Sequence, residues 1–169
     1  IVAVYHSHFL EHLDRDVARS FLVEVRRVLK PGGVQRIVVP DFEKLARAYV
    51  AHVVACEGST NEGDRHEEYI AALIEQSVRR EGFGASHQRP IVRVLDNWLV
   101  GDARRRGETH QWMYDQTSLE FLLKSVGFKR IERHGYATSL IPGWSEYGLD
   151  VDSCGCEYKP DSLYMEAVK

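Results

Sequence analysis

A concentration of reactive side chains lies near the start of the chain, in the segment HSHFLEH at residues 6–12. It holds three imidazoles and one carboxylate. Both kinds of group can exchange a proton near neutral pH when their surroundings tune them, and both can bind a metal ion. General acid–base chemistry and metal binding are therefore the two interpretations to separate.

Residues 8–12 match H-x-x-E-H, in which two histidines one helical turn apart bind zinc and the glutamate is a general base. This pattern would make a zinc hydrolase that uses His8, Glu11 and His12. The motif needs an established helix and a third protein ligand, whereas here it lies between a strand and a helix that begins near Asp14. We therefore expect histidines of a strand-to-helix turn, and no metal.

Three later segments carry weaker signals. His110, Trp112 and Tyr114 precede a capped helix and could reach a pocket, although packing of the two aromatic rings against the sheet is favoured. The run of arginines at Arg104–Arg106 is typical of a solvent-exposed charged surface. Cys154-x-Cys156 lacks a second pair at zinc spacing, and three cysteines are too few for a disulfide framework.

These residues must be positioned by alternating strands and helices. Apolar spacing predicts, in order, a strand at 1–5, a helix from about 14 to 30, a strand at 37–39, a helix from 41 to about 55 and a helical insert at about 57–108. A helix from 117 follows, with a capping box at Thr117–Glu120 and a stop at Gly127. Strands at 129–134 and 162–168 complete the prediction. This order predicts one α/β domain over residues 1–169.

Composition narrows the partners. The 22 basic and 25 acidic residues give a formal charge of −3, which favours neither nucleic acid nor an anionic membrane. No apolar run approaches the roughly 20 residues that cross a bilayer, and no signal-peptide pattern opens the chain. We expect a cytoplasmic protein that acts on a small molecule.

Five segments, spread over the first 50 and the last 62 residues of the chain, resemble a known family. The segments "HSHFLEHL", "EVRRVLKPGG" and "VQRIVVPD" occur in that order, and "THQWMYDQTSLEFLLKSVGFKRIERHG" and "DSLYMEAVK" follow. Together they resemble the fourth to seventh strands of class I S-adenosylmethionine-dependent methyltransferases, most closely a small type 11-like group. The resemblance covers roughly residues 1–50 and 108–169.

The resemblance implies a Rossmann-like sheet truncated to strands four to seven, in the order four, five, seven, six, and S-adenosylmethionine as cofactor. In such sheets ligands lie beyond the carboxyl ends of the strands. The implied residues are His8 and His110 for catalysis, His6 and Ser7 for the cofactor, and Asp41, Trp112 and Tyr114 for a small-molecule or sugar acceptor.

The family's glycine-rich loop and acidic ribose partner do not occur here, so we expect very weak cofactor binding by this chain. An N-terminal truncation would leave residues 1–5 as a sheet edge, and that edge carries no lysine or proline to discourage pairing. We expect a homodimer through it. The alternative to an enzyme is a methyltransferase-like assembly module without catalytic activity.

Overall fold

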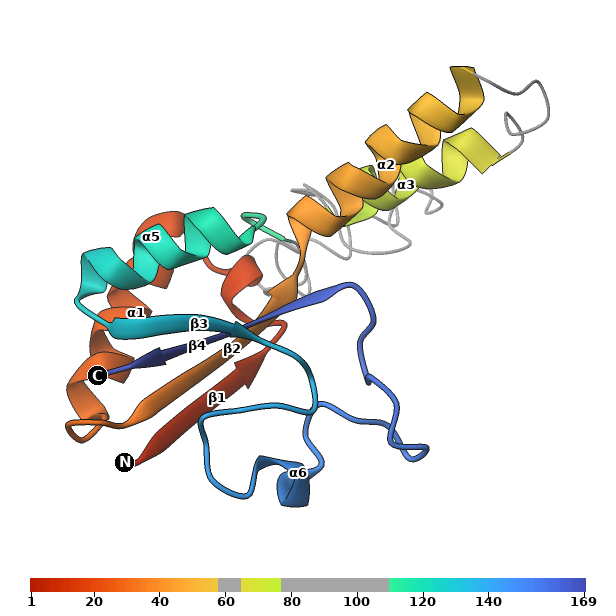
Figure 1. Ribbon diagram of the computed structural model, residues 1–169. Helices are drawn as coiled ribbons and strands as arrows, with labels where there is room; N and C mark the ends of the chain where they lie inside the picture. The colour runs from red at the N-terminus through yellow and green to blue at the C-terminus, as the bar shows by residue number, and fades with distance from the viewer. Residues whose placement is uncertain (58–64, 77–109) are drawn as a thin grey trace, which may run out of the picture.

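The computed structural model describes residues 1–57, 65–76 and 110–169, which form an α/β fold (Figure 1). Its elements are β1 (Ala3–Ser7), the 3-10 turn η1 (Leu10–His12), α1 (Arg15–Val28), β2 (Val34–Pro40), α2 (Phe42–Glu57), α3 (His66–Gln76), α5 (Gln116–Val126), β3 (Lys129–His134), α6 (Trp144–Tyr147) and β4 (Ser162–Val168). The predicted α/β class is confirmed, and the predicted strands and helices that fall on described residues occur in the predicted order; the short helix α6 was not predicted. The later part of the predicted insert, with Arg104–Arg106, lies outside the described residues.

The sheet has the order β1-β2-β4-β3. β1 and β2 are parallel, and β4 runs antiparallel to both of its neighbours, β2 and β3. Taken along the chain, this is the order that the family resemblance implied; that the four strands correspond to the family's fourth to seventh stays a prediction. β2 and β4 are the inner strands, and all their residues except Val168 are buried.

Helices cover one face of this sheet. α1 and α5 pack there, and their apolar stripes meet the buried residues of β2 and β4 in the main core (Figure 1), formed among others by Leu22, Val25, Ile37, Leu119, Leu123 and Met165. The opposite face carries a smaller cluster of Val34, Ile141 and Trp144. There the cover is the segment 135–161, which joins β3 to β4 and contains α6.

The ends of α5 show how local chemistry sets helix boundaries. Asp115, not Thr117, is the N-cap: its carboxylate accepts a hydrogen bond from Ser118 N at 2.7 Å, and Ser118 Oγ accepts one from Asp115 N at 3.1 Å. The predicted capping box at Thr117–Glu120 was therefore wrong by two residues, because the aspartate carboxylate supplies the stronger cap at the positive helix end. The predicted stop at Gly127 is confirmed by its φ of 96°.

α2 and α3 form a hairpin that projects from the end of the sheet (Figure 1). The ring of His52 on α2 stacks on Tyr69 of α3, with centroids 4.2 Å apart. Of all helices in the described part of the chain, none is both long and apolar enough to cross a membrane.

A fully buried arginine anchors the loop-covered face. The Arg36 guanidinium on β2 donates to Asp150 Oδ2 at 2.8 Å and to Glu166 Oε1 at 2.7 Å. It also donates to the main-chain oxygens of Gly135 and Thr138, each at 2.9 Å. This cation therefore ties the start and the middle of segment 135–161 to the centre of the sheet.

Both carboxylates have further donors. Tyr5 Oη donates to Asp150 Oδ1 at 2.7 Å, and Glu166 accepts from Leu140 N at 2.6 Å and from the Ser139 hydroxyl. A buried ion cluster is stable only when its lone pairs and protons are satisfied in this way.

We predict that Arg36→Met lowers the free energy of unfolding by about 3–5 kcal/mol, because two buried carboxylates lose their cation. Urea denaturation followed by circular dichroism measures this. The matched control is Arg27→Ala, whose ion pair with Glu24 is exposed and whose loss should cost less than about 1 kcal/mol. A loss below about 1 kcal/mol for Arg36→Met would show that the cluster does not hold the fold.

Candidate functional site

The parallel strands β1 and β2 end at the same edge of the sheet, and the candidate site lies there. β1 extends to Ser7, two residues beyond the predicted strand, because His6 and Ser7 pair in register with Ile37 and Val38. The chain then turns through His8, whose φ of 49° lies in the left-handed region and whose N–H donates to Val38 O at 2.8 Å. His8 thus stands at the head of the turn that carries Glu11.

The imidazole of His8 lies between a hydroxyl and a carboxylate. Its Nε2 is 3.0 Å from Ser162 Oγ, and its Nδ1 is 3.4 Å from Glu11 Oε1. The Ser162 hydroxyl donates its proton to Lys159 O at 2.7 Å, so the hydrogen between Ser162 and His8 must come from Nε2. This assignment leaves the lone pair of Nδ1 facing Glu11.

Glu11 is completely buried, and neither carboxylate oxygen has a hydrogen-bond partner among the described residues. Burial raises the pKa of Glu11 to about 7 and lowers the pKa of His8 to about 4. Desolvation disfavours the charged form of each group. Both side chains therefore tend toward neutrality, and a proton on Glu11 is placed to bridge its carboxyl to Nδ1 of His8.

Backbone contacts bring His110 to the same place. The main-chain oxygen of Glu11 accepts hydrogen bonds from Gln111 N at 2.7 Å and Trp112 N at 3.2 Å. This docks the start of the 110–115 segment on η1. The His110 ring packs edge-on against His12 with centroids 4.8 Å apart, and His110 Nδ1 is 3.0 Å from Gln76 O.

One donor atom each from Glu11, His12 and His110 lies within 4.8 Å of the others, a separation that a metal ion could bridge. His8 is not in this group. The inverted zinc motif therefore does not assemble as its pattern requires, since η1 is a single 3-10 turn rather than a turn of an established helix. The geometry instead unites Glu11 with both of the histidines predicted to be catalytic.

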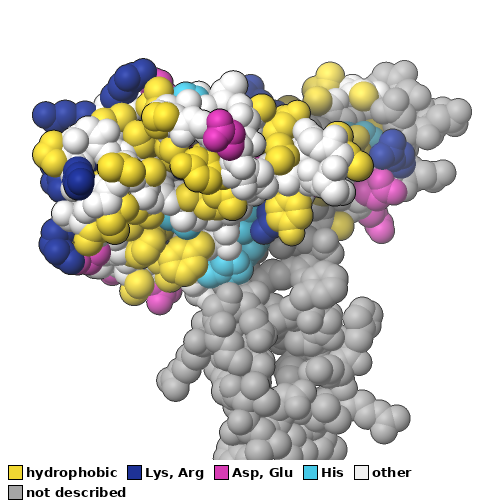
Figure 2. Space-filling view, turned by 90° about the horizontal axis from the view of Figure 1, so that it is seen from below, with side chains coloured by type: hydrophobic (Ala, Val, Ile, Leu, Met, Phe, Trp, Pro, Cys, Tyr) yellow, Lys and Arg dark blue, Asp and Glu magenta, His cyan; other side chains and the backbone are white. Residues whose placement is uncertain are grey.

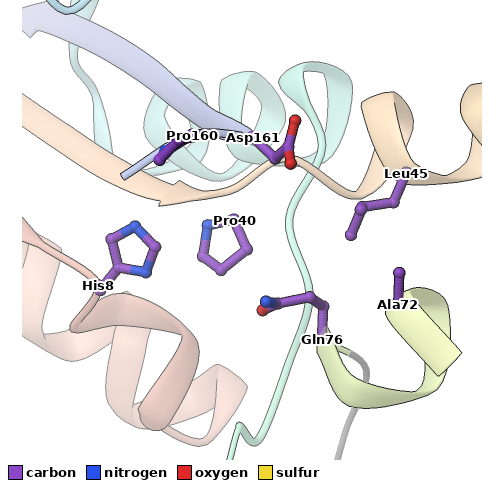
Figure 3. A pocket seen from close by; sticks show the side chains of 7 residues that line it. All are labelled: His8, Pro40, Leu45, Ala72, Gln76, Pro160 and Asp161. Atoms are coloured by element: carbon purple, nitrogen blue, oxygen red, sulfur yellow. The ribbon is translucent and has the colours of Figure 1, made fainter. Parts of the chain in front are cut away.

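A cavity of about 180 Å³ opens beside His8. Its walls come from the end of β2, from α2 and α3, and from the loop before β4; they are formed by His8, Pro40, Leu45, Ala72, Gln76, Pro160 and Asp161 (Figure 3). In Figure 3 the Gln76 side chain extends toward His8 and Pro40. The cavity thus offers one imidazole and polar partners in a partly apolar pocket.

The two residues predicted to contact a cofactor lie in β1. His6 Nε2 is 2.9 Å from Gln35 Nε2, and the imidazole packs edge-on against Phe21. Burial lowers the pKa of His6 to about 4. Neither His6 nor Ser7 lines the cavity beside His8, so their cofactor role stays a prediction.

The predicted acceptor residues are also not among those that line that cavity. Asp41 is buried, accepts from Lys44 N at 3.1 Å as a cap of α2, and accepts from Arg133 at 2.9 Å. Tyr114 is a core residue, as the packing alternative proposed. It shares a second cavity, of about 490 Å³, with Trp112 and Arg15. Their acceptor role stays a prediction too.

Ser162 is the residue of this site that sequence reasoning missed. It lies 154 residues from His8 in the chain and meets it because β4 enters the sheet beside β2, with Ser162 opposite Pro40. No local pattern marks a serine at the start of a strand as the partner of a distant histidine.

Comparison with known proteins adds one structural likeness. No protein-family model matches the chain, and neither does any curated protein. The crystal structure of an S-adenosylmethionine-dependent methyltransferase from Archaeoglobus fulgidus aligns with all of this chain at 12% identity and a TM-score of 0.42. The chain spans 59% of that protein's length.

We predict that Glu11→Gln stabilises the protein at alkaline pH. The raised pKa means that the folded state holds the proton of Glu11 until about pH 7, whereas the unfolded chain releases it near pH 4.5. Wild-type stability should therefore fall as pH rises through this window. The advantage of Glu11→Gln should grow by about 2–3 kcal/mol between about pH 5 and pH 8.

Urea denaturation at each pH, with EDTA present, measures this difference. Glu24→Gln is the control, because Glu24 is exposed on α1, and its effect should not vary with pH in the same way. An advantage of Glu11→Gln that stays constant across the range would contradict the raised pKa.

Proposed function

We propose that this chain supplies the acceptor side of an S-adenosylmethionine-dependent methyltransferase. The observation that carries the proposal is the pairing of buried Glu11 with His8, which lines a cavity at the carboxyl ends of β1 and β2, where open α/β sheets bind ligands. The motifs of residues 1–50 and 108–169 and the strand order support the same family.

The described residues do not fit a full cradle for the cofactor. Neither β1 nor β2 is followed by a glycine that would let the backbone approach a nucleoside; His8 and Phe9 follow β1, and Asp41 and Phe42 follow β2. When bound, S-adenosylmethionine would supply an electrophilic methyl group on a sulfonium. What can be derived from this chain is the handling of the acceptor and its proton.

An acceptor hydroxyl that enters the cavity meets the edge of the His8 imidazole. Ser162 fixes the ring through Nε2, and the remaining lone pair on Nδ1 faces Glu11. With Glu11 ionised, the hydroxyl can give its proton to Nδ1 of His8 as its oxygen attacks, and the Glu11 carboxylate then accepts a hydrogen bond from the new Nδ1–H. Because the pKa of Glu11 lies near 7, a large share of the molecules carry the ionised carboxylate at neutral pH, as general-base catalysis requires.

The cavity favours a compact acceptor. At about 180 Å³ it holds a small molecule or one sugar ring rather than a polymer. Its polar groups, the Gln76 amide and the Asp161 carboxylate, are of the kind that bind hydroxyls. We therefore propose a small polyhydroxylated acceptor, such as a sugar.

The test is transfer of a labelled methyl group from S-adenosylmethionine to a panel of sugars and small alcohols, using the complete product of the gene that contains this chain. Glu11→Gln and His8→Asn should each lower turnover by at least about 100-fold, as loss of a general base does. His134→Asn is the control, since His134 lies on β3 beside Glu166. Unchanged turnover in both site variants would refute the role of the pair.

We further propose that two copies meet at β1. β1 is an edge of the described sheet, and Ile1 and Val2 beside it are 59% and 70% exposed. Figure 2, the view from below Figure 1, shows hydrophobic side chains gathered over this part of the molecule. Unpaired strand edges with apolar side chains favour pairing with a second chain.

Light scattering at about 50 µM, a range in which moderate dimers persist, should give the mass of a dimer, and Val2→Lys should give a monomer. Val4 packs against the core and is left unchanged. The control is Phe121→Lys, at an exposed position on α5. A monomeric wild type, or a dimer that Val2→Lys leaves intact, would exclude this edge as the interface.

A further inference from the structure

A second cluster of metal-binding side chains lies on the α2–α3 hairpin, away from the His8 cavity. His52 and Cys56 project from α2, and His66 is the first residue of α3. One donor atom from each lies within 4.8 Å of the other two. None of these residues has a part in the proposed methyl transfer.

His52 and Cys56 are brought together by their spacing of four residues on α2. Positions i and i+4 of a helix lie on one face, one turn apart. The His52 Nε2 and Cys56 Sγ atoms are accordingly 3.4 Å apart. Zinc binds imidazole nitrogen at about 2.0 Å and thiolate sulfur at about 2.3 Å, which places such ligands about 3.5 Å apart around a tetrahedral ion.

His66 completes the cluster from the other helix. Its ring is nearly parallel to that of His52, with centroids 5.5 Å apart, and its Nδ1 is buried without a hydrogen-bond partner among the described residues. A buried ring nitrogen without a partner is unfavourable, and coordination through this nitrogen would satisfy it.

The surroundings hold these side chains in place. His52 is only 8% exposed, and its ring stacks with that of Tyr69, at a centroid distance of 4.2 Å, and with that of His66. Tyr49 lies beside the His66 ring at 5.9 Å. Ligands fixed in this way lose little conformational freedom when a metal ion binds.

We propose that His52, Cys56 and His66 form a site for a borderline-soft transition-metal ion, Zn²⁺ by preference, that fastens α2 to α3. Two imidazoles and a thiolate suit zinc and disfavour Mg²⁺ and Ca²⁺, which bind oxygen. The thiol of Cys56 loses its proton on binding, and the ion takes the sulfur lone pair. Three protein ligands leave a fourth position for water.

Cobalt titration of the metal-free chain tests this proposal directly, because Co²⁺ replaces Zn²⁺ in tetrahedral sites and reports its ligands by absorption. We expect one equivalent to give intense visible bands together with a thiolate-to-cobalt charge-transfer band in the near ultraviolet, both removed by added Zn²⁺. Cys56→Ser should abolish the charge-transfer band, and His66→Gln should weaken Zn²⁺ binding by at least about tenfold. The control is the double variant Cys154→Ser/Cys156→Ser, which removes the two exposed cysteines and should leave the spectrum unchanged.

Each alternative outcome overturns the proposal. A spectrum without the thiolate band would place the ion on oxygen and nitrogen ligands such as Glu11, His12 and His110. Loss of the band in the Cys154→Ser/Cys156→Ser variant would assign it to that pair, and absence of binding at equimolar cobalt would exclude the site. Circular dichroism of each variant without metal checks that the helices persist, and Zn²⁺ protection of the Cys56 thiol from a disulfide reagent gives a second readout in the unmodified chain.

Discussion

The buried ion pairs of Arg36 with Asp150 and Glu166 are the interaction on which the rest of the fold depends. Helices cover one face of the four-stranded sheet, so the other face needs a different cover, and segment 135–161 provides it with few apolar side chains. Arg36 replaces hydrophobic packing there by joining Asp150 and Glu166 at the centre of the sheet. An uncompensated charge in this position would cost several kcal/mol, so the segment is held as one unit with β2 and β4.

This constraint reaches the candidate site through the chain itself. Segment 135–161 leads directly into Ser162, the first residue of β4, and Ser162 holds the imidazole of His8. The segment that the Arg36 cluster holds is therefore continuous with the residue that contacts His8. Glu11 is the opposite case: among the described residues no lysine or arginine forms an ion pair with it, and burial raises the pKa of its carboxyl to about 7. The Arg36 cluster is thus compensated by its partners, whereas Glu11 can gain or lose a proton near neutral pH.

Most of the fold, but little of the candidate site, could be predicted from local patterns in the sequence. Apolar spacing located α1 and β4, glycine chemistry located the end of α5 at Gly127, and the family resemblance implied the strand order that the sheet adopts. The burial of Arg36 and Glu11 was not predictable in this way, because each is surrounded by residues distant in the chain. Asp41 illustrates the limit: its oxygens cap α2 and bind Arg133, and the second of these contacts joins residues far apart in the chain that no local pattern relates.

The central claim is that ligands of a methyltransferase bind at the carboxyl ends of β1 and β2 in this chain. Two-dimensional NMR with titrated S-adenosylhomocysteine, the demethylated product, measures this at residue level. The account predicts fast-exchange shifts at the amides of residues 8–12 and 41–42, with a Kd weaker than about 0.1 mM because the glycine-rich cradle is not among the described residues. Resonances of these amides that do not move at about 5 mM product, or shifts that saturate below about 1 µM, would contradict it.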